Sequence, residues 1–320
     1  MRVVVKLAGQ ARVFVRAPVH TPRPNFIRQF SAAKMAYQEK KLAVIGAGQM
    51  GLGIALVAAS VAKLPVSLID SSADSLARAD SFLDSLLAKD VKKGRLTAAG
   101  ADEVKGRIVQ TTDFSLVSDA DFIIEAVPEI PALKTDIFAR LAAAASPTAV
   151  LATNTSSISI TKIAAAAKGA EHRVVSTHFM NPVPVQKGVE VIVGLQTAPE
   201  TLARALELVK RLGKVPSISK DSPGFLANRI LIPYINEAVI CLETGVGTKE
   251  DIDSIMKNGC AMPMGPLALA DFIGLDTVLA IMNVLYNDMS DSKYRPAVLL
   301  QKMVDAGWLG KKSGKGFYEY

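Results

Sequence analysis

The chain has 320 residues, half of them hydrophobic, and is therefore long enough for two domains with a core each. Its formal charge of +7 comes from residues 1–38, which contain seven of the 37 basic residues and no acidic residue. The remaining 30 basic residues balance the 30 acidic residues. The rest of the chain is therefore near neutral, which excludes a nucleic-acid-binding domain. No apolar run reaches the ~18 to 20 residues of a membrane span, so we expect a soluble protein. The two cysteines, Cys241 and Cys260, lack metal-ligand spacing, so we expect no metal site.

The first segment, residues 1–36, is predicted to be a mitochondrial transit peptide, which implies a location in the mitochondrial matrix. It carries arginines and no acid, a composition typical of such peptides. The stretch Arg28-Gln-Phe-Ser-Ala-Ala33 also resembles a matrix-processing site. The alternative is a disordered basic tail.

Residues 37–219 alternate between short apolar runs and longer helical segments, a pattern typical of a mostly parallel sheet covered by helices on both faces. They are predicted to form an α/β domain of the Rossmann type. We expect strands at 42–46, 65–70, 107–112, 121–127, 149–155, 173–179 and 188–193, and helices at 50–63, 72–89 and 131–144, with further helices between or after the later strands.

From Ser222 onward the pattern is helical, with almost no strand signal. Residues 220–320 are therefore predicted to form an all-α C-terminal domain. We expect this domain to take part in substrate binding and, because of its length and many apolar positions, to form a homodimer. We expect helices at 225–243, 249–257, 266–272, 277–286 and 297–306.

A glycine-rich turn follows the first strand, and Gly46-Ala-Gly48-Gln49-Met50-Gly51 matches the dinucleotide-binding pattern G-x-G-x-x-G. The motif is weak alone, but here it ends a strand and opens a helix, whose N-terminus can bind a pyrophosphate. Asp70 ends the second strand, 19 residues after Gly51, where an acid hydrogen-bonds the adenosine ribose and repels the extra phosphate of NADP. The sequence therefore predicts NAD rather than NADP.

The candidate base is His178, which ends an apolar strand at the edge of the sheet where ligands bind. A lone histidine is more often an ordinary core residue, but Glu190 follows twelve residues later and can hold the imidazole in one tautomer. Ser156, Asn181 and Asn228 stand after a strand, in a turn and at the domain boundary. Each alone could be a cap or turn residue. Together they predict a site between the two domains.

Several stretches carry a resemblance to a known family. The chain resembles the L-3-hydroxyacyl-CoA dehydrogenases, including the 3-hydroxybutyryl-CoA members, from about residue 40 to its last residue. The matching stretches are the glycine-rich turn, Asn154-Thr-Ser-Ser157, His178-Phe-Met-Asn-Pro-Val-Pro184, Asp221-Ser-Pro-Gly-Phe-Leu-Ala-Asn-Arg229, Pro263-Met-Gly-Pro266 and Gly310-Lys-Lys-Ser-Gly-Lys-Gly-Phe-Tyr318.

The resemblance implies a role for each site residue. His178 resembles the general base and Glu190 its orienting partner, and Ser156 and Asn228 resemble the groups that hydrogen-bond the substrate oxygen at C3. The residues that it implies around the cofactor are Ser156, Asn181, Glu129, Lys134 and Lys312, beside the glycine-rich turn and Asp70. For Glu129 and Lys134 the alternative is an ordinary exposed pair near the start of a helix.

The coenzyme A end of the substrate has a weaker signal. A basic stretch of Lys89, Lys92, Lys93 and Arg95 could bind its phosphates, and the alternative is a solvated helix end. Ser81 and Leu86 stand where the resemblance leads us to expect lysines.

The resemblance implies NAD-dependent oxidation of a short- or medium-chain L-3-hydroxyacyl-CoA, such as 3-hydroxybutyryl-CoA, to the 3-ketoacyl-CoA in fatty-acid β-oxidation. Two alternatives stay open: a dehydrogenase of a free hydroxyacid such as gulonate, and a non-catalytic NAD-binding protein. A third class, the 3-hydroxyisobutyrate and 6-phosphogluconate dehydrogenases, is disfavoured because it uses a lysine as acid and base, and none replaces the His178–Glu190 pair.

Overall fold

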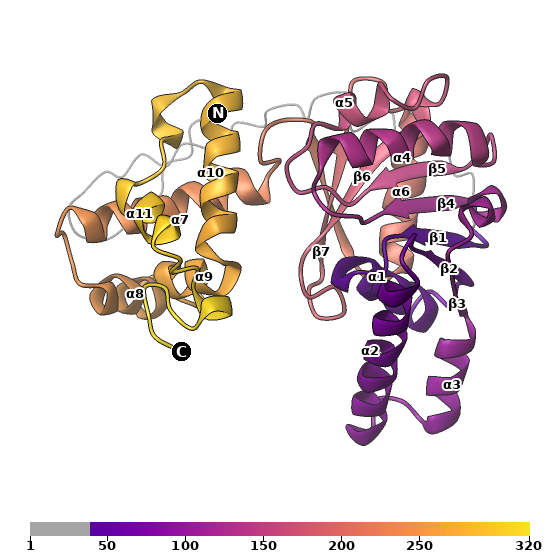
Figure 1. The fold of residues 1–320 in the computed structure, drawn as a ribbon, viewed down its shortest axis with the longest axis horizontal. Helices are drawn as coiled ribbons and strands as arrows, with labels where there is room; N and C mark the ends of the chain where they lie inside the picture. The colour runs from indigo at the N-terminus through magenta and orange to yellow at the C-terminus, as the bar shows by residue number, and fades with distance from the viewer. Residues whose placement is uncertain (1–38) are drawn as a thin grey trace, which may run out of the picture. The chain divides into compact units, whose positions relative to one another are not determined.

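The computed structural model describes residues 39–320, so the predicted transit peptide lies outside the described residues. The first part of this range contains one eight-stranded sheet with strand order β3-β2-β1-β4-β5-β6-β7-β8 (Figure 1). The strands are β1 (Leu42–Ile45), β2 (Val66–Ile69), β3 (Ile108–Thr111), β4 (Phe122–Glu125), β5 (Val150–Thr153), β6 (Val174–Phe179), β7 (Gly188–Val193) and β8 (Val215–Lys220).

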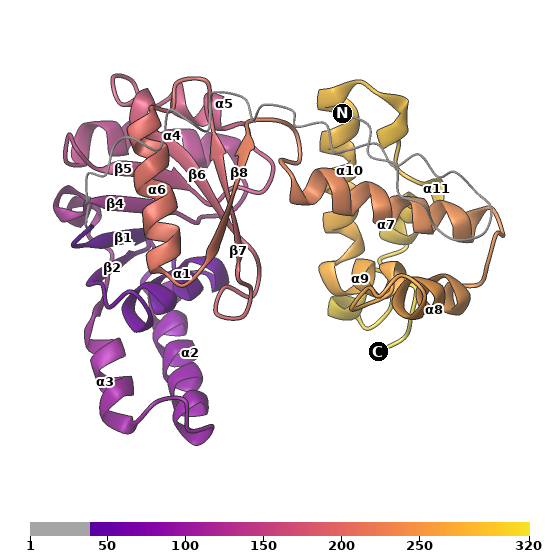
Figure 2. The same ribbon diagram turned by 180° about the vertical axis from the view of Figure 1, so that it is seen from behind.

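The sheet is parallel except where β7 runs antiparallel to β6. Helices cover both faces: Figure 1 shows α4 and α5 on the near face, and Figure 2, seen from behind, shows α6 on the other. The expected mostly parallel sheet with helices on both faces is confirmed. Its helices are α1 (Gln49–Ser60), α2 (Ala73–Lys92), α3 (Ala98–Gly106), α4 (Pro131–Ala144), α5 (Ile160–Ala164) and α6 (Pro199–Arg211).

Sequence reasoning missed α3 and β8. The strand β8 lies at the edge of the sheet, and most of its side chains are exposed, so it lacks the apolar run of the central strands. The helix α3 has only one buried residue, Val104, and therefore shows almost no helical stripe.

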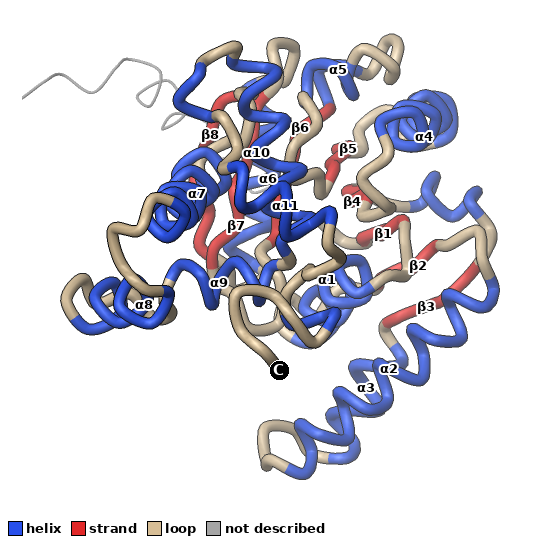
Figure 3. Tube along the Cα trace, turned by 60° about the vertical axis from the view of Figure 1, so that its left-hand side comes forward, coloured by secondary structure: helices blue, strands red, loops and turns tan. Residues whose placement is uncertain are grey.

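After β8 the described chain forms helices and no further strand. Figure 3 shows these helices, α7 to α11, in blue. Its helices bury a second core that includes Ile235, Val239, Leu275, Met282 and Leu300. The predicted all-α C-terminal region is confirmed. The helices are α7 (Ala227–Glu243), α8 (Lys249–Asn258), α9 (Pro266–Ile273), α10 (Leu275–Met289) and α11 (Val298–Asp305).

Within residues 39–320 no single helix is long and apolar enough to cross a membrane; α9 and α10 pass that test only as a pair bent by 98°.

Candidate active site and dinucleotide-binding turn

The glycine-rich turn between β1 and α1 has three glycines with different surroundings. Gly46 has φ +102°, and a Cβ there would lie 2.7 Å from the carbonyl oxygen of Ala126. A Cβ on Gly51 would lie 1.8 Å from the carbonyl oxygen of Gly46, so no side chain fits. A Cβ on Gly48 would meet nothing within 4 Å. The fold therefore requires Gly46 and Gly51, whereas Gly48 keeps open space free beside the backbone.

Gly48 is also the N-cap residue of α1. The helix begins at Gln49 with no side-chain cap and no acidic residue in its first turn. Its first N–H groups thus remain available to an anion, and the helix dipole favours negative charge there. The geometry fits the pyrophosphate of a dinucleotide.

Asp70 follows β2 and lies against the same turn. One carboxylate oxygen accepts a hydrogen bond from the Ala47 N–H at 2.8 Å, and the other accepts from the Ser72 N–H at 2.9 Å. The carboxylate is therefore fixed beside the glycine-rich turn, at the position from which an acid binds ribose hydroxyls. Together with the turn, it meets the requirements of NAD binding.

His178 and Glu190 stand directly opposite each other on the antiparallel strands β6 and β7. The Nδ1 of His178 lies 2.9 Å from Oε2 of Glu190, and only 8% and 5% of the two residues are exposed. Burial alone would raise the pKa of Glu190, but hydrogen bonds from His178, Ala227 and Leu226 outweigh it and lower that pKa. An ionised Glu190 accepts the Nδ1 hydrogen, which leaves Nε2 of His178 to take a proton.

The other oxygen of Glu190 holds the beginning of the helical part. Oε1 accepts hydrogen bonds from the backbone N–H groups of Leu226 at 2.8 Å and Ala227 at 3.0 Å, at the N-terminus of α7. A carboxylate at a helix N-terminus is stabilised by the unpaired N–H groups and by the helix dipole. One side chain thus both orients the histidine and anchors α7.

The segment before α7 has a further anchor in Phe225, which sequence reasoning missed. Its backbone has φ +49°, strained for a residue with a side chain, and its ring is buried in the core of the sheet domain. The ring meets His178 edge-on, with centroids 6.1 Å apart. The only sequence signal was its place in the stretch Asp221–Arg229.

Ser156 and Asn228, which are 72 residues apart in the sequence, are in contact. The side-chain amide of Asn228 donates to the carbonyl oxygen of Ser156 at 3.1 Å. The Asn154 side chain accepts from the Phe179 N–H at 2.8 Å, so the segment after β5 is tied to the end of β6, one residue after His178. Polar groups from segments that are far apart in sequence thus lie together where β5 and β6 end.

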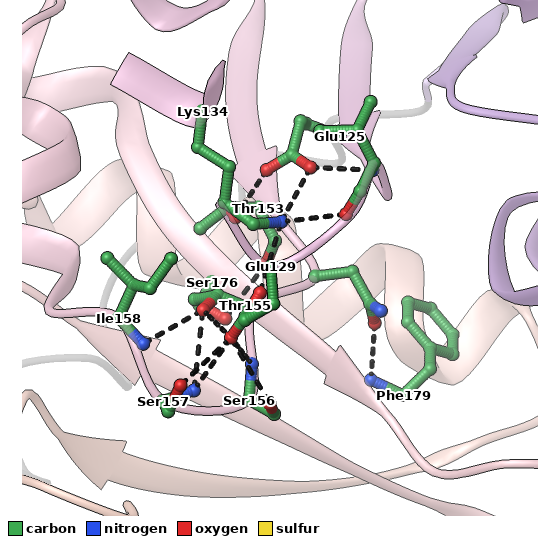
Figure 4. Close-up of polar contacts among 12 residues, drawn as sticks. Glu125, Glu129, Lys134, Thr153, Thr155, Ser156, Ser157, Ile158, Ser176 and Phe179 are labelled. Carbon is green, nitrogen blue, oxygen red and sulfur yellow. Dashed lines mark hydrogen bonds and ion pairs between the residues drawn. The ribbon is translucent and has the colours of Figure 1, made fainter. Parts of the chain in front are cut away.

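The alternative of an ordinary exposed pair is wrong for Lys134, whereas the side chain of Glu129 is 34% exposed. Lys134 is fully buried; its Nζ lies 2.7 Å from Oε1 of Glu125 and 3.4 Å from Oε2 of Glu129. Glu129 accepts hydrogen bonds from the segment 155–157 (Figure 4). Burial would raise the pKa of Glu129, but Lys134 and hydrogen bonds from Thr155 and Ser156 lower it.

Other expected residues take no part in the hydrogen bonds described above. Lys312 pairs with Asp276 of α10, its Nζ lying 2.6 Å from Oδ1, and Asn181 is exposed in the turn after β6. In the basic stretch, Arg95 pairs with Asp90 at 3.1 Å. The contacts of Lys312 therefore join it to the helical part, and its expected place at the cofactor stays a prediction.

Two family models match the chain. Residues 41–222 match the model described as "3-hydroxyacyl-CoA dehydrogenase, NAD binding domain", and residues 224–320 match "3-hydroxyacyl-CoA dehydrogenase, C-terminal domain".

Similar proteins agree with these models. A probable 3-hydroxybutyryl-CoA dehydrogenase of Deinococcus radiodurans is 50% identical over 280 residues, which cover 88% of this chain and 100% of that protein. The 3-hydroxybutyryl-CoA dehydrogenase of Bradyrhizobium diazoefficiens is 49% identical over 286 residues, 89% of this chain and 97% of that protein. The crystal structure of the (S)-3-hydroxybutyryl-CoA dehydrogenase of Ralstonia eutropha has a TM-score of 0.86 at 44% identity, over 88% of this chain and 99% of that one.

The origin of the relatives contradicts the predicted transit peptide over residues 1–36 and the matrix location. Relatives at 47% to 50% identity come from bacteria, namely Deinococcus, Bacillus, Bradyrhizobium and Clostridioides. They point to a cytoplasmic rather than a mitochondrial enzyme. The composition of residues 1–36 misled the prediction, because a segment with several arginines and no acid is not necessarily a transit peptide.

Proposed function

Since this chain belongs to the 3-hydroxyacyl-CoA dehydrogenase family, we propose that the residues gathered at the edge of its sheet carry out the family's reaction. The chain is an NAD-dependent oxidoreductase that converts an L-3-hydroxyacyl-CoA, such as 3-hydroxybutyryl-CoA, to the 3-ketoacyl-CoA. This activity is consistent with a role in fatty-acid β-oxidation. When bound, NAD supplies the two-electron acceptor for the hydrogen that leaves C3.

The contact between His178 and Glu190 supports the proposed mechanism most directly. With Nδ1 directed to Glu190, the free Nε2 of His178 takes the proton of the 3-hydroxyl group. The positive charge that His178 then acquires is stabilised by the adjacent carboxylate. In the reverse direction His178 returns the proton to the 3-keto oxygen.

Ser156 and Asn228 are proposed to bind the substrate oxygen. Both carry polar hydrogens, and donors fixed in advance around a developing negative charge lower the barrier without reorganisation. Their mutual contact supports the assignment, because the side-chain amide of Asn228 donates one of its two hydrogens to Ser156 and has the second for the substrate.

The cofactor residues are proposed as two groups. Gly46, Gly48, Gln49, Met50 and Gly51 bind the pyrophosphate, and Asp70 binds the adenosine ribose. Asn181 is proposed to lie near the nicotinamide, and Ser156, Glu129 and Lys312 are proposed as further contacts of the cofactor. Lys134 is buried, so we propose that it acts on the cofactor only through Glu129.

We propose residues 37–219 as the NAD-binding domain and 220–320 as the substrate and dimerisation domain. The end of β8 at Lys220 and the second hydrophobic core support this boundary. A homodimer through the helical domain is proposed because large apolar side chains on its surface remain exposed, among them Ile230, Val246, Ile255 and Phe272.

The substrate class is tested by offering NAD⁺ and three alcohols to the full chain: (S)-3-hydroxybutyryl-CoA, free 3-hydroxybutyrate and gulonate. We expect NADH formation with the coenzyme A ester and rates at least about 100-fold lower with the free acids, because the coenzyme A contacts are lost. Equal or faster turnover of gulonate would replace the proposal with its hydroxyacid alternative.

A further inference from the structure

A fully buried ion pair lies under the segment that carries Ser156. Glu125, at the end of β4, and Lys134, on α4, both have 0% exposure, and their charged atoms are 2.7 Å apart. Glu125 also accepts from the Val127 N–H at 2.7 Å and from the Thr153 hydroxyl at 2.7 Å. Figure 4 shows this pair above the serine-rich segment after β5.

Such a pair is weak evidence for stability. Two charges lose their hydration when they are buried, and an apolar pair of the same volume is often at least as stable. A buried pair whose members hold defined partners can instead fix the position of neighbouring groups. Glu129 is a neighbouring group whose position the pair can fix, since it is a second carboxylate within ion-pair distance of Lys134.

Glu129 connects the buried pair to Ser156. Its Oε2 lies 3.4 Å from the ammonium of Lys134. Its Oε1 accepts from the Ser156 and Ser157 N–H groups at 2.8 and 3.0 Å, and from the Thr155 hydroxyl at 2.6 Å. The Ser156 hydroxyl lies 3.1 Å from the same oxygen. A single carboxylate thus holds both the backbone and the side chain of Ser156.

We propose that Glu125 and Lys134 are positioning residues that act through Glu129 to fix Ser156 for the substrate oxygen. This inference rests on the proposed function, in which Ser156 binds the oxygen at C3. Glu125 holds the ammonium of Lys134, Lys134 holds Glu129, and Glu129 holds the backbone of Ser156. The carbonyl of Ser156 in turn accepts from Asn228, so the same chain of contacts sets the second donor.

The contacts also define how Ser156 responds to substrate. Its hydroxyl has one hydrogen, which Glu129 accepts in this structure. That hydrogen must turn to the substrate oxygen during binding, while the backbone bonds to Glu129 keep the segment in place. The ammonium of Lys134 partly neutralises Glu129 and so weakens its competition for this hydrogen.

The test compares Glu125→Gln, Glu129→Gln and a matched control in the full chain. Glutamine keeps the shape of Glu125 and removes its charge. The control is Glu39→Gln, which breaks another buried ion pair, between Glu39 and Arg204, whose carboxylate contacts lie at 2.8 Å and do not involve the serine segment. Activity is measured as NADH oxidation by acetoacetyl-CoA, and exchange of the Ser156 and Ser157 amide hydrogens is measured without substrate.

We expect Glu125→Gln and Glu129→Gln each to lower kcat about 10-fold or more, with KM for acetoacetyl-CoA changed less than about threefold. The double variant Glu125→Gln/Glu129→Gln should have a kcat no lower than that of Glu129→Gln alone, because the two residues act through the same contacts. Both variants should speed exchange at the Ser156 and Ser157 amides. The control should lower Tm while kcat and that exchange stay as in the wild type.

Wild-type kcat in Glu129→Gln, or in a folded Glu125→Gln, would overturn the positioning role, as would unchanged amide exchange. If Glu125→Gln does not fold, the kcat and amide exchange of Glu129→Gln test the positioning role. The Glu129 side chain is 34% exposed, so we expect that variant to fold. A wild-type protein without turnover would instead refute the proposed function, and the amide exchange would still test the contacts.

Discussion

His178 and Glu190 come from neighbouring strands, and their pairing follows from strand register. They are directly opposite in the antiparallel β6–β7 pair, so the twelve-residue separation in sequence becomes a 2.9 Å contact. Glu190 has a second partner in the first N–H groups of α7. The charge of this one residue therefore supports both the base and the entry into the helical domain.

The lowered pKa of Glu190 predicts a dependence of stability on pH. A carboxyl group whose pKa is lower in the folded state stabilises the fold above its ordinary value near 4.5, and this contribution is lost as the pH falls through the lowered value. Glu190→Gln should therefore lower Tm most at neutral pH, and the difference should shrink below about pH 4.

Thermal unfolding of both proteins between pH 7 and 3.5 checks this expectation. A Tm difference that is the same across the whole range would show that Glu190 contributes no charge-dependent stability. Asp90→Asn, in an exposed ion pair with Arg95, serves as a control and should change Tm little at any pH.

At this scale the sequence indicated His178, Glu190, Ser156 and Asn228, because each stands beside a strand end or in a recognisable stretch. The sequence did not indicate a role for Glu125, because a glutamate that ends an apolar strand is expected to be exposed to solvent. Only the contact with Lys134 reveals it, and that contact depends on how α4 packs against β4.

Among the elements, the glycine-rich turn makes a sharp prediction. Gly48→Ala places its methyl group in open space, so Tm should stay within about 2 °C, while the dissociation constant for NADH rises about 10-fold or more because the methyl group occupies space near the backbone. Gly51→Ala places it 1.8 Å from a carbonyl oxygen, so the domain should be strongly destabilised.

Thermal unfolding and NADH fluorescence titration separate the two effects. Unchanged NADH affinity in Gly48→Ala would show that the dinucleotide does not approach this turn. Wild-type Tm in Gly51→Ala would show that α1 does not pack against the turn as closely as the structure has it.

Helices and strands were predictable from the sequence where their buried side chains form a regular apolar pattern. The helix Pro131–Ala144 and the strand Gly188–Val193 have the predicted bounds, because a proline begins the first and a buried run fills the second. The edge strand β8 was missed because its pairing with β7, rather than its side chains, makes it a strand.

For the whole molecule, the exposed apolar side chains of the helical domain predict a homodimer. Sedimentation velocity at micromolar concentration should give about twice the mass of one chain. Ile230→Lys combined with Ile255→Lys should shift the protein toward monomer, because two charges would oppose burial of the interface. A wild-type protein that sediments only as a monomer would remove the dimer from the proposal.

The division into two domains was predictable from the change in pattern near residue 220, since the buried apolar residues recur with a different period in strands than in helices. What the sequence could not predict was how the segment between them is held. Phe225 reaches into the core of the sheet domain, and Asp221 accepts hydrogen bonds from Ser159 at 2.7 Å and from the Thr161 N–H at 2.8 Å. These are contacts between residues some 60 positions apart.

In the proposed mechanism His178 transfers the proton while other residues bind the cofactor, and the variant His178→Gln separates these two roles. NADH affinity and NADH oxidation by acetoacetyl-CoA are measured on the same preparation of the full chain. We predict an NADH dissociation constant within about twofold of the wild type and a kcat lower by about 10²- to 10⁴-fold, the contribution of a general acid or base. Turnover at the wild-type rate by His178→Gln would contradict the mechanism, since no other residue in it can exchange the proton.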